Sequence, residues 1–345
     1  MSAAPPVILY RYDASPYSHK IDNALLLKGI SHSRVNVSLV LPRPEITDLL
    51  GITYRRIPIL AIGNDVYCDT RQVFAAQDSK AILIVSALER RFPPSAGHGT
   101  LLPRGKHGGS SDTGLVKAFS KYYVDQLFSL GPLLLPWDKL GPDFIKDRST
   151  FFGAPLDVKA VQAARPQTMS KLASHYALVE EQLSDDREWL FDTELPGLAD
   201  ISVHFLLAWV GGFQGVESLY DKTQIPRTIK WLSRVSAFLE NKKKNQPVPI
   251  MIKGEDAADQ IVNSVHESLS IVGFNNTEAE RLGLEQGDEV KVAPQDTGRT
   301  FPTVGKLVAL NREEVIVQVQ GQRGAIHAHF PRLGFVIQPT VKGKL

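Results

Sequence analysis

The tetrapeptide Ser15-Pro16-Tyr17-Ser18 lies where an apolar, strand-like stretch ends and a helical pattern begins, and its composition suits the activation of a thiol. A helix N-terminus presents unpaired N–H groups and a partial positive charge, and the Ser15 hydroxyl beside it can donate to an anion. A free thiol has a pKa of about 8.5, and lowering it by about two units requires about 2.7 kcal/mol of preference for the thiolate. One charge-assisted hydrogen bond supplies about 1.5–3 kcal/mol, and the helix end adds about 0.3–1 kcal/mol. Ser15 and the helix terminus are therefore sufficient in magnitude, although serine before proline is also an ordinary helix cap.

Two further positions could bind an extended peptide ligand. Pro58 stands at the start of a strand, where a cis bond would turn the backbone of Ile57 outward and offer its N–H and C=O groups to an added strand. Asp69 and Thr70 open a helix, where a carboxylate, a hydroxyl and the helix N-terminus can hold an α-amino and α-carboxylate pair. Each has an ordinary interpretation as well: an edge-strand proline in the first case and a helix cap in the second.

The elements that must position these residues follow from the apolar periodicity of the N-terminal part. The pattern predicts a strand, a helix, a strand, a short helix, a hairpin and a helix, over residues 7–12, 18–29, 32–39, 44–50, 57–62 with 66–68, and 70–92. Gly63-Asn64 supplies the hairpin turn. This order is that of a thioredoxin-like α/β layer, with residues 1–94 as its domain.

The remaining chain divides by composition. Glycine, serine and proline are frequent in residues 95–113, which predicts a linker. Residues 114–246 have helical spacing throughout, with helices expected at 115–130, 156–183, 199–211 and 226–241. Residues 247–345 are expected to form a short helix and a small all-β, barrel-like extension. The expected elements there are a helix at 255–267 and strands at 289–293, 303–310, 314–319, 325–329 and 334–338.

Together these motifs resemble the glutathione transferase superfamily, in a serine-type, fungal-like form with an extra C-terminal β domain. The resemblance is strongest over residues 7–92. It rests on Ser15-Pro16-Tyr17-Ser18-His19-Lys20, on Ile57-Pro58-Ile59-Leu60 and on the Asp69-Thr70 pair. It implies the fold class: an α/β thioredoxin-like domain, then an all-α glutathione-transferase C-terminal domain, then the small β extension.

The resemblance also implies which residues contact glutathione. They are Ser15 toward the sulfur, Ile57 and Pro58 on the cysteinyl backbone, Asp69 and Thr70 at the γ-glutamyl end, and Arg56 near the glycyl carboxylate. Tyr10 and Tyr12 are rivals for the sulfur contact because some classes use an early tyrosine. Ser15 is preferred because both tyrosines precede the turn. Serine cannot form a mixed disulfide, so thiol–disulfide exchange is not expected.

The helical half supports the same interpretation. Leu198-Ala199-Asp200-Ile201-Ser202 resembles the capped core helix of the family, with the aspartate in a structural role. The family's second substrate lies between the two domains. We therefore expect a second-substrate pocket with three tyrosines, Tyr17, Tyr122 and Tyr123.

Composition limits the other classes. The formal net charge is +2, which gives no electrostatic reason to expect nucleic acid. Apolar runs are too short for a membrane span. Cys68 is the one cysteine, and it is expected on a buried strand without a redox role. His327 and His329 share a strand face but have no evident third ligand, so no metal is expected.

The expected function is that of a glutathione transferase: the glutathione thiol, as co-substrate, is activated for attack on a small electrophilic molecule. Alternatives are a glutathione-dependent isomerase or lyase, and a non-catalytic binding or regulatory protein of the same fold. The resemblance implies a homodimer. The N-terminus lacks the features of a signal peptide, so the protein is expected in the cytoplasm. The tripeptide Gly343-Lys344-Leu345 is a weak peroxisomal alternative.

Overall fold

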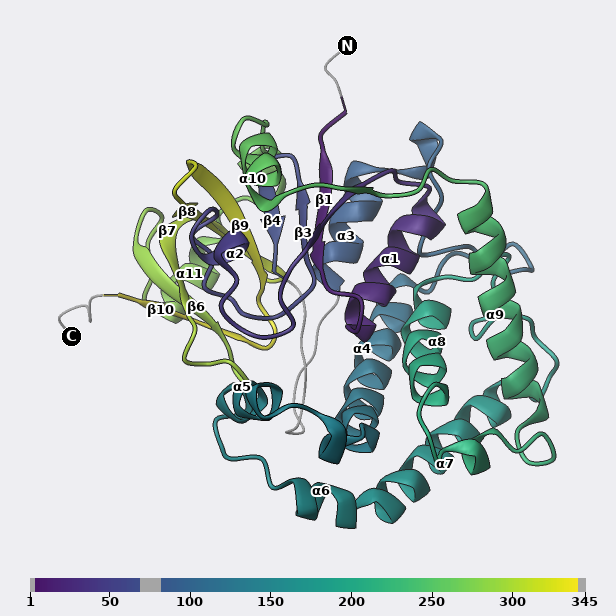
Figure 1. The fold of residues 1–345 in the computed structure, drawn as a ribbon. Helices are drawn as coiled ribbons and strands as arrows, with labels where there is room; N and C mark the ends of the chain where they lie inside the picture. The colour runs from purple at the N-terminus through teal and green to yellow at the C-terminus, as the bar shows by residue number, and fades with distance from the viewer. Residues whose placement is uncertain (1–3, 69–81, 341–345) are drawn as a thin grey trace.

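An α/β layer opens the chain in the computed structural model, which describes residues 4–68 and 82–340 (Figure 1). Its elements are β1 (Val7–Arg11), α1 (Pro16–Lys28), β2 (Ser33–Asn36), α2 (Pro44–Thr47), β3 (Ile59–Ile62), β4 (Asp65–Tyr67) and α3 (Ile82–Arg91). β1 is parallel to β2 and antiparallel to β3, and β4 is antiparallel to β3. The order is that of the predicted thioredoxin-like layer. The first part of the helix predicted over 70–92 lies outside the described residues.

Local signals in the sequence fix both ends of α1. Ser15 is the N-cap, its side chain accepts a hydrogen bond from the Ser18 N–H, and Pro16 occupies the first turn, where no N–H is needed. Gly29 ends the helix with φ of 68°, a left-handed conformation that glycine adopts without strain. The position of Ser15 at the helix N-terminus is therefore set by local chemistry.

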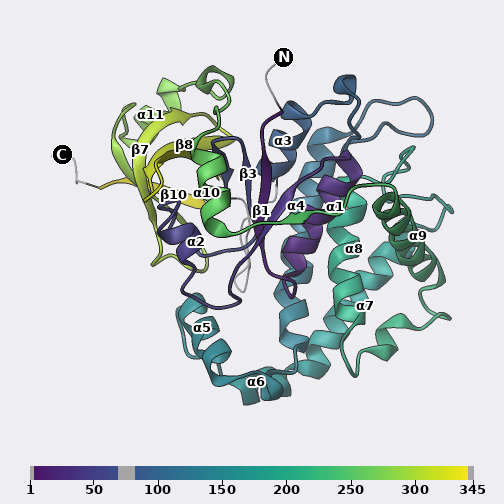
Figure 2. The same cartoon turned by 45° about the horizontal axis from the view of Figure 1, so that its top comes forward.

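The helical half follows a linker that includes a 3₁₀ turn at Pro94–Ala96. Its helices are α4 (Thr113–Leu130), α5 (Pro142–Phe152), α6 (Val158–Ala163), α7 (Arg165–Gln182), α8 (Leu198–Gly211) and α9 (Pro226–Lys244), with 3₁₀ turns at Gly131–Leu134, Trp137–Lys139 and Glu217–Tyr220. α8 packs against both α1 and α4, and α9 lies on its other side (Figures 1 and 2). It is buried along nearly its whole length. The prediction of one continuous helix over 156–183 is wrong. α6 and α7 are separate helices, because Pro166 lacks the N–H that a continuous helix would need. α5 was not predicted.

The C-terminal part adds β5 (Ile250–Met251), α10 (Gly254–Val262), a 3₁₀ turn (Leu269–Ile271) and α11 (Asn276–Leu282). Its strands are β6 (Glu289–Pro294), β7 (Thr303–Leu310), β8 (Glu314–Gln320), β9 (Ala325–Pro331) and β10 (Phe335–Pro339). The strands β6 to β10 form an antiparallel sheet, so the predicted β extension is confirmed. The sequence did not predict that β9 pairs in parallel with β4. One sheet therefore runs through both parts in the order β10-β6-β7-β8-β9-β4-β3-β1-β2-β5.

The two faces of this sheet bury two different cores. Successive residues of a strand point to opposite faces, and Leu9 accordingly packs with α1, α3 and the helical half, whereas Ile8 and Tyr10 face the other way. The second core also contains Val317 and Phe330 of β8 and β9. The extension thus shares its hydrophobic core with the N-terminal layer.

A buried charge cluster lies where β9 meets β4. Nε2 of His329 is 2.9 Å from Oδ1 of Asp65, and its Nδ1 contacts the Glu314 carboxylate. Oδ2 of Asp65 also accepts from Nη1 of Arg91 at 2.6 Å and from the backbone N–H of Glu267 at 2.7 Å. Burial lowers the pKa of His329, but the hydrogen bonds and charges of the two carboxylates outweigh it and raise the pKa to about 9. The extension is therefore attached by an ionic cluster as well as by strand pairing.

Candidate functional site

Three chain segments meet at one end of the strands in the N-terminal sheet. β1 and β3 are antiparallel with Tyr10 opposite Ile59, and β4 is antiparallel to β3. The end of β1, the start of β3 and the end of β4 therefore lie side by side. Ser15 follows β1, and Ile57 and Pro58 precede β3, joined by a cis peptide bond. The topology thus brings together two of the three motifs predicted to bind glutathione. Asp69 and Thr70, which would follow β4, lie outside the described residues.

Ser15 combines a capping role with a remaining donor. Its Oγ accepts from the Ser18 N–H at 3.2 Å, and its own N–H donates to the Tyr12 carbonyl at 3.1 Å. A hydroxyl has one hydrogen to donate and two lone pairs, so the cap bond leaves the hydroxyl hydrogen available to a thiolate. Ser15 is fully buried. The cap interpretation and the thiol interpretation of Ser15 are thus compatible.

The rival tyrosines have other surroundings. Tyr10 is fully buried in the second core, and burial raises its pKa, which disfavours the phenolate. Tyr12 is also buried and lies beneath the guanidinium of Arg43, whose carbon is 5.7 Å from the ring centroid. Cys68 directly follows β4, is buried, and its N–H donates to the His329 carbonyl at 2.9 Å.

Arg56, predicted near the glycyl carboxylate, is buried against the extension. Its Nη2 contacts the Asp296 carboxylate and donates to the Thr297 hydroxyl at 3.0 Å. Both partners come from the segment after β6, so only the tertiary structure reveals them. A ligand carboxylate at Arg56 would share the guanidinium with Asp296.

The adjacent Arg55 is held by α5, the helix that the sequence did not predict. Nη2 of Arg55 lies 2.8 Å from each oxygen of Asp147, and its guanidinium carbon is 5.0 Å from the ring centroids of Phe151 and Phe301. Arg43 joins the same cluster by donating to the backbone carbonyls of Ser38 and Arg55. Burial lowers the pKa of Arg43 to about 10. The cluster connects α5, the loop before α2 and the extension. The sequence signal for α5 is its start, Gly141-Pro142-Asp143.

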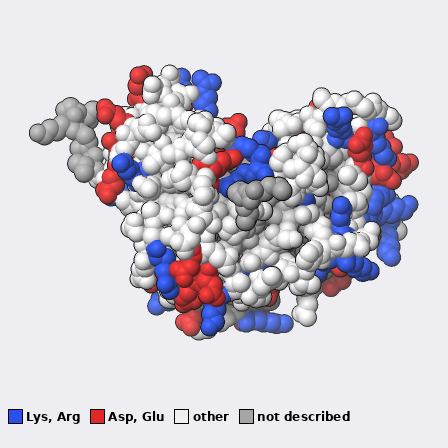
Figure 3. All heavy atoms as spheres, turned by 90° about the horizontal axis from the view of Figure 1, so that it is seen from above, with Lys and Arg blue, Asp and Glu red and all other residues white. Residues whose placement is uncertain are grey.

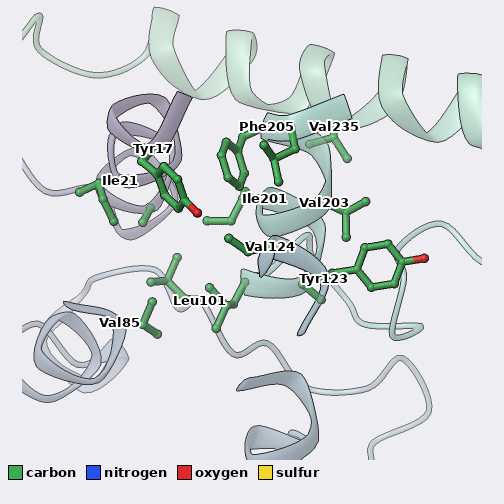
Figure 4. Close-up of a cluster of buried hydrophobic side chains, with 14 of the residues drawn as sticks. Tyr17, Ile21, Val85, Leu101, Tyr123, Val124, Ile201, Val203, Phe205 and Val235 are labelled. Carbon is green, nitrogen blue, oxygen red and sulfur yellow. The ribbon is translucent and has the colours of Figure 1, made fainter. Parts of the chain in front are cut away.

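The three tyrosines predicted to line the second-substrate pocket do not converge. Tyr17 is buried, with its ring centroid 4.6 Å from that of Phe128 and 5.5 Å from that of Phe205. Figure 4 shows Tyr17 among aliphatic side chains of the helical half, with the Tyr123 hydroxyl directed away from it. Tyr123 is buried and borders a surface groove with Leu178 of α7, and Tyr122 is exposed. The second-substrate pocket stays a prediction.

Charges of both signs are interspersed on the face shown in Figure 3, which carries no continuous basic surface. None of the described helices is long and apolar enough to cross a membrane. Within the described ranges no group of three or more His, Cys, Asp or Glu side chains is arranged to hold a metal ion.

Comparison with known families agrees with this geometry. Residues 9–95 match the family described as glutathione S-transferase, N-terminal domain, and residues 130–244 match a domain of unknown function, DUF7962. No protein of curated function matches the chain. The N-terminal part of the chain, residues 9–95, therefore resembles the N-terminal domain of glutathione S-transferases.

Solved structures extend the likeness to the full length. A GST-like protein from Pseudomonas syringae is 24% identical, with a TM-score of 0.67 over 97% of this chain and 99% of that chain. The match therefore includes the β extension. Rice GST1 in complex with glutathione is 19% identical, covering 75% of this chain and 96% of that chain with a TM-score of 0.45. The transferase URE2P8 from Phanerochaete chrysosporium, with oxidized glutathione, is 14% identical over 71% and 98%, also with a TM-score of 0.45.

Proposed function

We propose that the protein is a glutathione transferase-like enzyme that binds glutathione at the edge formed by β1, β3 and β4 and activates its thiol for attack on a small electrophile. The observation that carries the proposal is the Ser15 hydroxyl. It caps α1 through the Ser18 N–H and still has its hydrogen to donate. Ile57 and Pro58 lie at the same end of these strands. An extended tripeptide bound there would run antiparallel to the segment of Ile57 and Pro58.

The chemistry is electrostatic stabilisation of the thiolate. The sulfur of bound glutathione would accept from the Ser15 hydroxyl and lie in the field of the α1 N-terminus. These two contributions lower the thiol pKa to about 6.5, so most of the bound thiol is ionised at neutral pH. The thiolate then attacks the electrophile and a new C–S bond forms. In a substitution the bond to the leaving group breaks and that group departs with the electron pair, whereas in an addition the resulting carbanion accepts a proton from water. No metal takes part in this scheme.

The test is the pKa of the bound thiol, measured by ultraviolet thiolate absorbance over a pH series in the presence of saturating protein. We expect Ser15→Ala to raise that pKa by about one to two units, because one charge-assisted hydrogen bond is worth about 1.5–3 kcal/mol. Binding of glutathione itself, followed by calorimetry, should weaken much less, since the peptide backbone contacts remain.

The matched control is Ser202→Ala, another fully buried serine, on α8 in the helical half. It should leave the pKa of the bound thiol unchanged. Equal pKa values in wild type and Ser15→Ala would remove Ser15 from thiol activation. No heat at millimolar glutathione would favour a non-catalytic binding or regulatory protein of the same fold.

The same thiolate also serves an isomerase or lyase, which uses it transiently. A screen of model electrophiles with glutathione distinguishes the two, because conjugation consumes the thiol and isomerisation does not. We also propose a homodimer in the cytoplasm, and sedimentation of the full chain tests the oligomeric state. The peroxisomal tripeptide 343–345 lies outside the described residues.

A further inference from the structure

The loop that joins β6 to β7, residues 295–302, lies against the residues that precede the cis proline. At the end of this loop the Tyr54 N–H donates to the Thr303 hydroxyl at 3.2 Å. In its middle the Gly298 N–H donates to the carbonyl of Phe151 on α5 at 3.0 Å, and Figure 1 shows α5 beside the loop. The β6–β7 loop is therefore held in place both by the N-terminal layer and by the helical half.

Arg56 is the charged group that this loop covers. Its side chain is fully buried, and the Asp296 side chain that it contacts is 2% exposed. Nη2 of Arg56 also donates to the Thr297 hydroxyl at 3.0 Å and to the Thr297 backbone carbonyl. A guanidinium away from water needs a carboxylate partner, because an unpaired buried charge is strongly destabilising. Arg56 thus already binds, from within the chain, the kind of group that it was expected to bind on a ligand.

The direction of a bound peptide places its C-terminal residue beside Arg56. A peptide that adds to Ile57 as an antiparallel strand runs in the opposite direction to the protein chain. With its cysteine opposite Ile57, the residue after the cysteine lies beside Arg56. In glutathione that residue is glycine, and its carboxylate would meet the pair of Arg56 and Asp296. Two carboxylates would then compete for one guanidinium, and their like charges would repel each other.

The neighbouring arginines also direct donors to the chain itself. Nη2 of Arg55 lies 2.8 Å from each oxygen of Asp147, and these two side chains are 3% and 9% exposed. Arg43 and Arg148 both donate to the Leu39 carbonyl, at 3.2 and 3.0 Å. The structure therefore provides internal partners for the cations around this end of the site.

We infer that Asp296 is a specificity-determining residue of the thiol site: it occupies Arg56 in place of a ligand carboxylate, so the site recognises the γ-glutamyl-cysteinyl part of its thiol and gains no affinity from the glycyl carboxylate. This inference rests on the proposed function, because it concerns the same site. The thiols that it defines are γ-glutamylcysteine and its C-terminal derivatives, of which glutathione is one. Asp296 acts through Arg56 and is therefore a positioning residue.

The experiment is calorimetric titration of the full chain with three thiols. They are glutathione, γ-glutamylcysteine, which lacks the glycine, and the glycyl ethyl ester of glutathione, which lacks the charge. We expect all three to bind the wild type with affinities within about threefold of one another, which is less than the effect of one charge-assisted hydrogen bond. If the wild type bound glutathione about tenfold more tightly than the other two, Arg56 would be serving the glycyl carboxylate and the inference would be overturned.

Asp296→Asn tests the residue itself. Asparagine keeps the shape and one acceptor but removes the charge, so Arg56 can bind a ligand carboxylate. We expect this variant to bind glutathione about tenfold more tightly than the wild type does, with the dipeptide and the ester unchanged. A double variant, Arg56→Gln with Asp296→Asn, leaves no unpaired buried charge and should bind the three thiols equally again. Glu267→Gln, which removes the carboxylate 2.6 Å from Arg90, is the control and should keep the wild-type ratios.

The outcomes distinguish this inference from the proposed function. No heat with any of the three thiols at millimolar concentration would overturn the proposed function and this inference with it. Binding of all three thiols by Asp296→Asn in the wild-type ratios would overturn the role of Asp296 alone and leave thiol binding intact. A preference for glutathione that persists in the double variant would do the same.

Discussion

Glu314→Gln tests the charge cluster that attaches the extension. Glu314 is buried, and its carboxylate accepts from His329, whose other nitrogen donates to Asp65. Glutamine keeps the shape and removes the charge. A His329 pKa raised from 6.5 to about 9 corresponds to about 3 kcal/mol of stability. Because the folded pKa is the higher one, this stability is fully present below pH 6.5 and is lost as the pH rises through 9.

The neighbouring groups act in a different pH range. The pKa of His327 is lowered to about 4, chiefly by burial, so its contribution is present above about pH 6.5 and is lost as the pH falls toward 4. The pKa of Asp65 is lowered by its bonds to His329, Glu267 and Arg91, which outweigh its burial, and its contribution is lost only in acid. The alkaline window therefore reports on His329.

The assay is urea unfolding of wild type and Glu314→Gln at a series of pH values between about 6 and 10. We expect the variant to be less stable at pH 6 by about 1.5–3 kcal/mol, the worth of a hydrogen bond to a charged group. The difference should shrink above pH 9, where wild-type His329 becomes neutral. Glu313→Gln, the exposed neighbour, is the control and should follow wild type. Parallel pH curves for Glu314→Gln and wild type would refute the reasoning.

Two further substitutions test the core of the helical half and the contact between the N-terminal layer and the extension. The buried Asp200 carboxylate accepts from three donors at 2.9 to 3.0 Å: the N–H groups of Leu190 and Gly197 and Nε1 of Trp231. Asp200→Asn places an NH₂ group among these donors. Thermal and urea unfolding should show a loss of about 3 kcal/mol, and a loss below 1 kcal/mol would contradict this account. Gly51→Ala would put a Cβ 2.4 Å from the Gln320 carbonyl oxygen at a φ of +72°. Gly51→Ala should lower the free energy of unfolding by more than Gly29→Ala does. At Gly29 φ is also positive but the space is open, and a loss of about 1–2 kcal/mol is expected. Equal losses would mean that the contact between Gly51 and Gln320 accommodates the methyl group.

The helix start at Ser15 could be predicted because its signals are local. Ser15 before Pro16 specifies the start of α1 through a hydroxyl cap and a missing N–H, and neither depends on distant residues. Alternating apolar residues likewise predicted β1 and most of the extension strands. The tyrosine pocket could not be predicted in the same way. Helical spacing shows that Tyr17 and Tyr123 lie on apolar faces but not which neighbouring helix covers them.

The sequence by itself thus determined the order of the elements in the N-terminal layer, the helix N-terminus that presents Ser15, and the character of the extension, since each depends on chemistry within a few residues. Only the tertiary structure decided that β9 pairs with β4, that Asp296 binds Arg56, and that Asp147 of α5 binds Arg55. These contacts join residues far apart in the chain. Their register and partners depend on how whole surfaces pack, which no local pattern encodes.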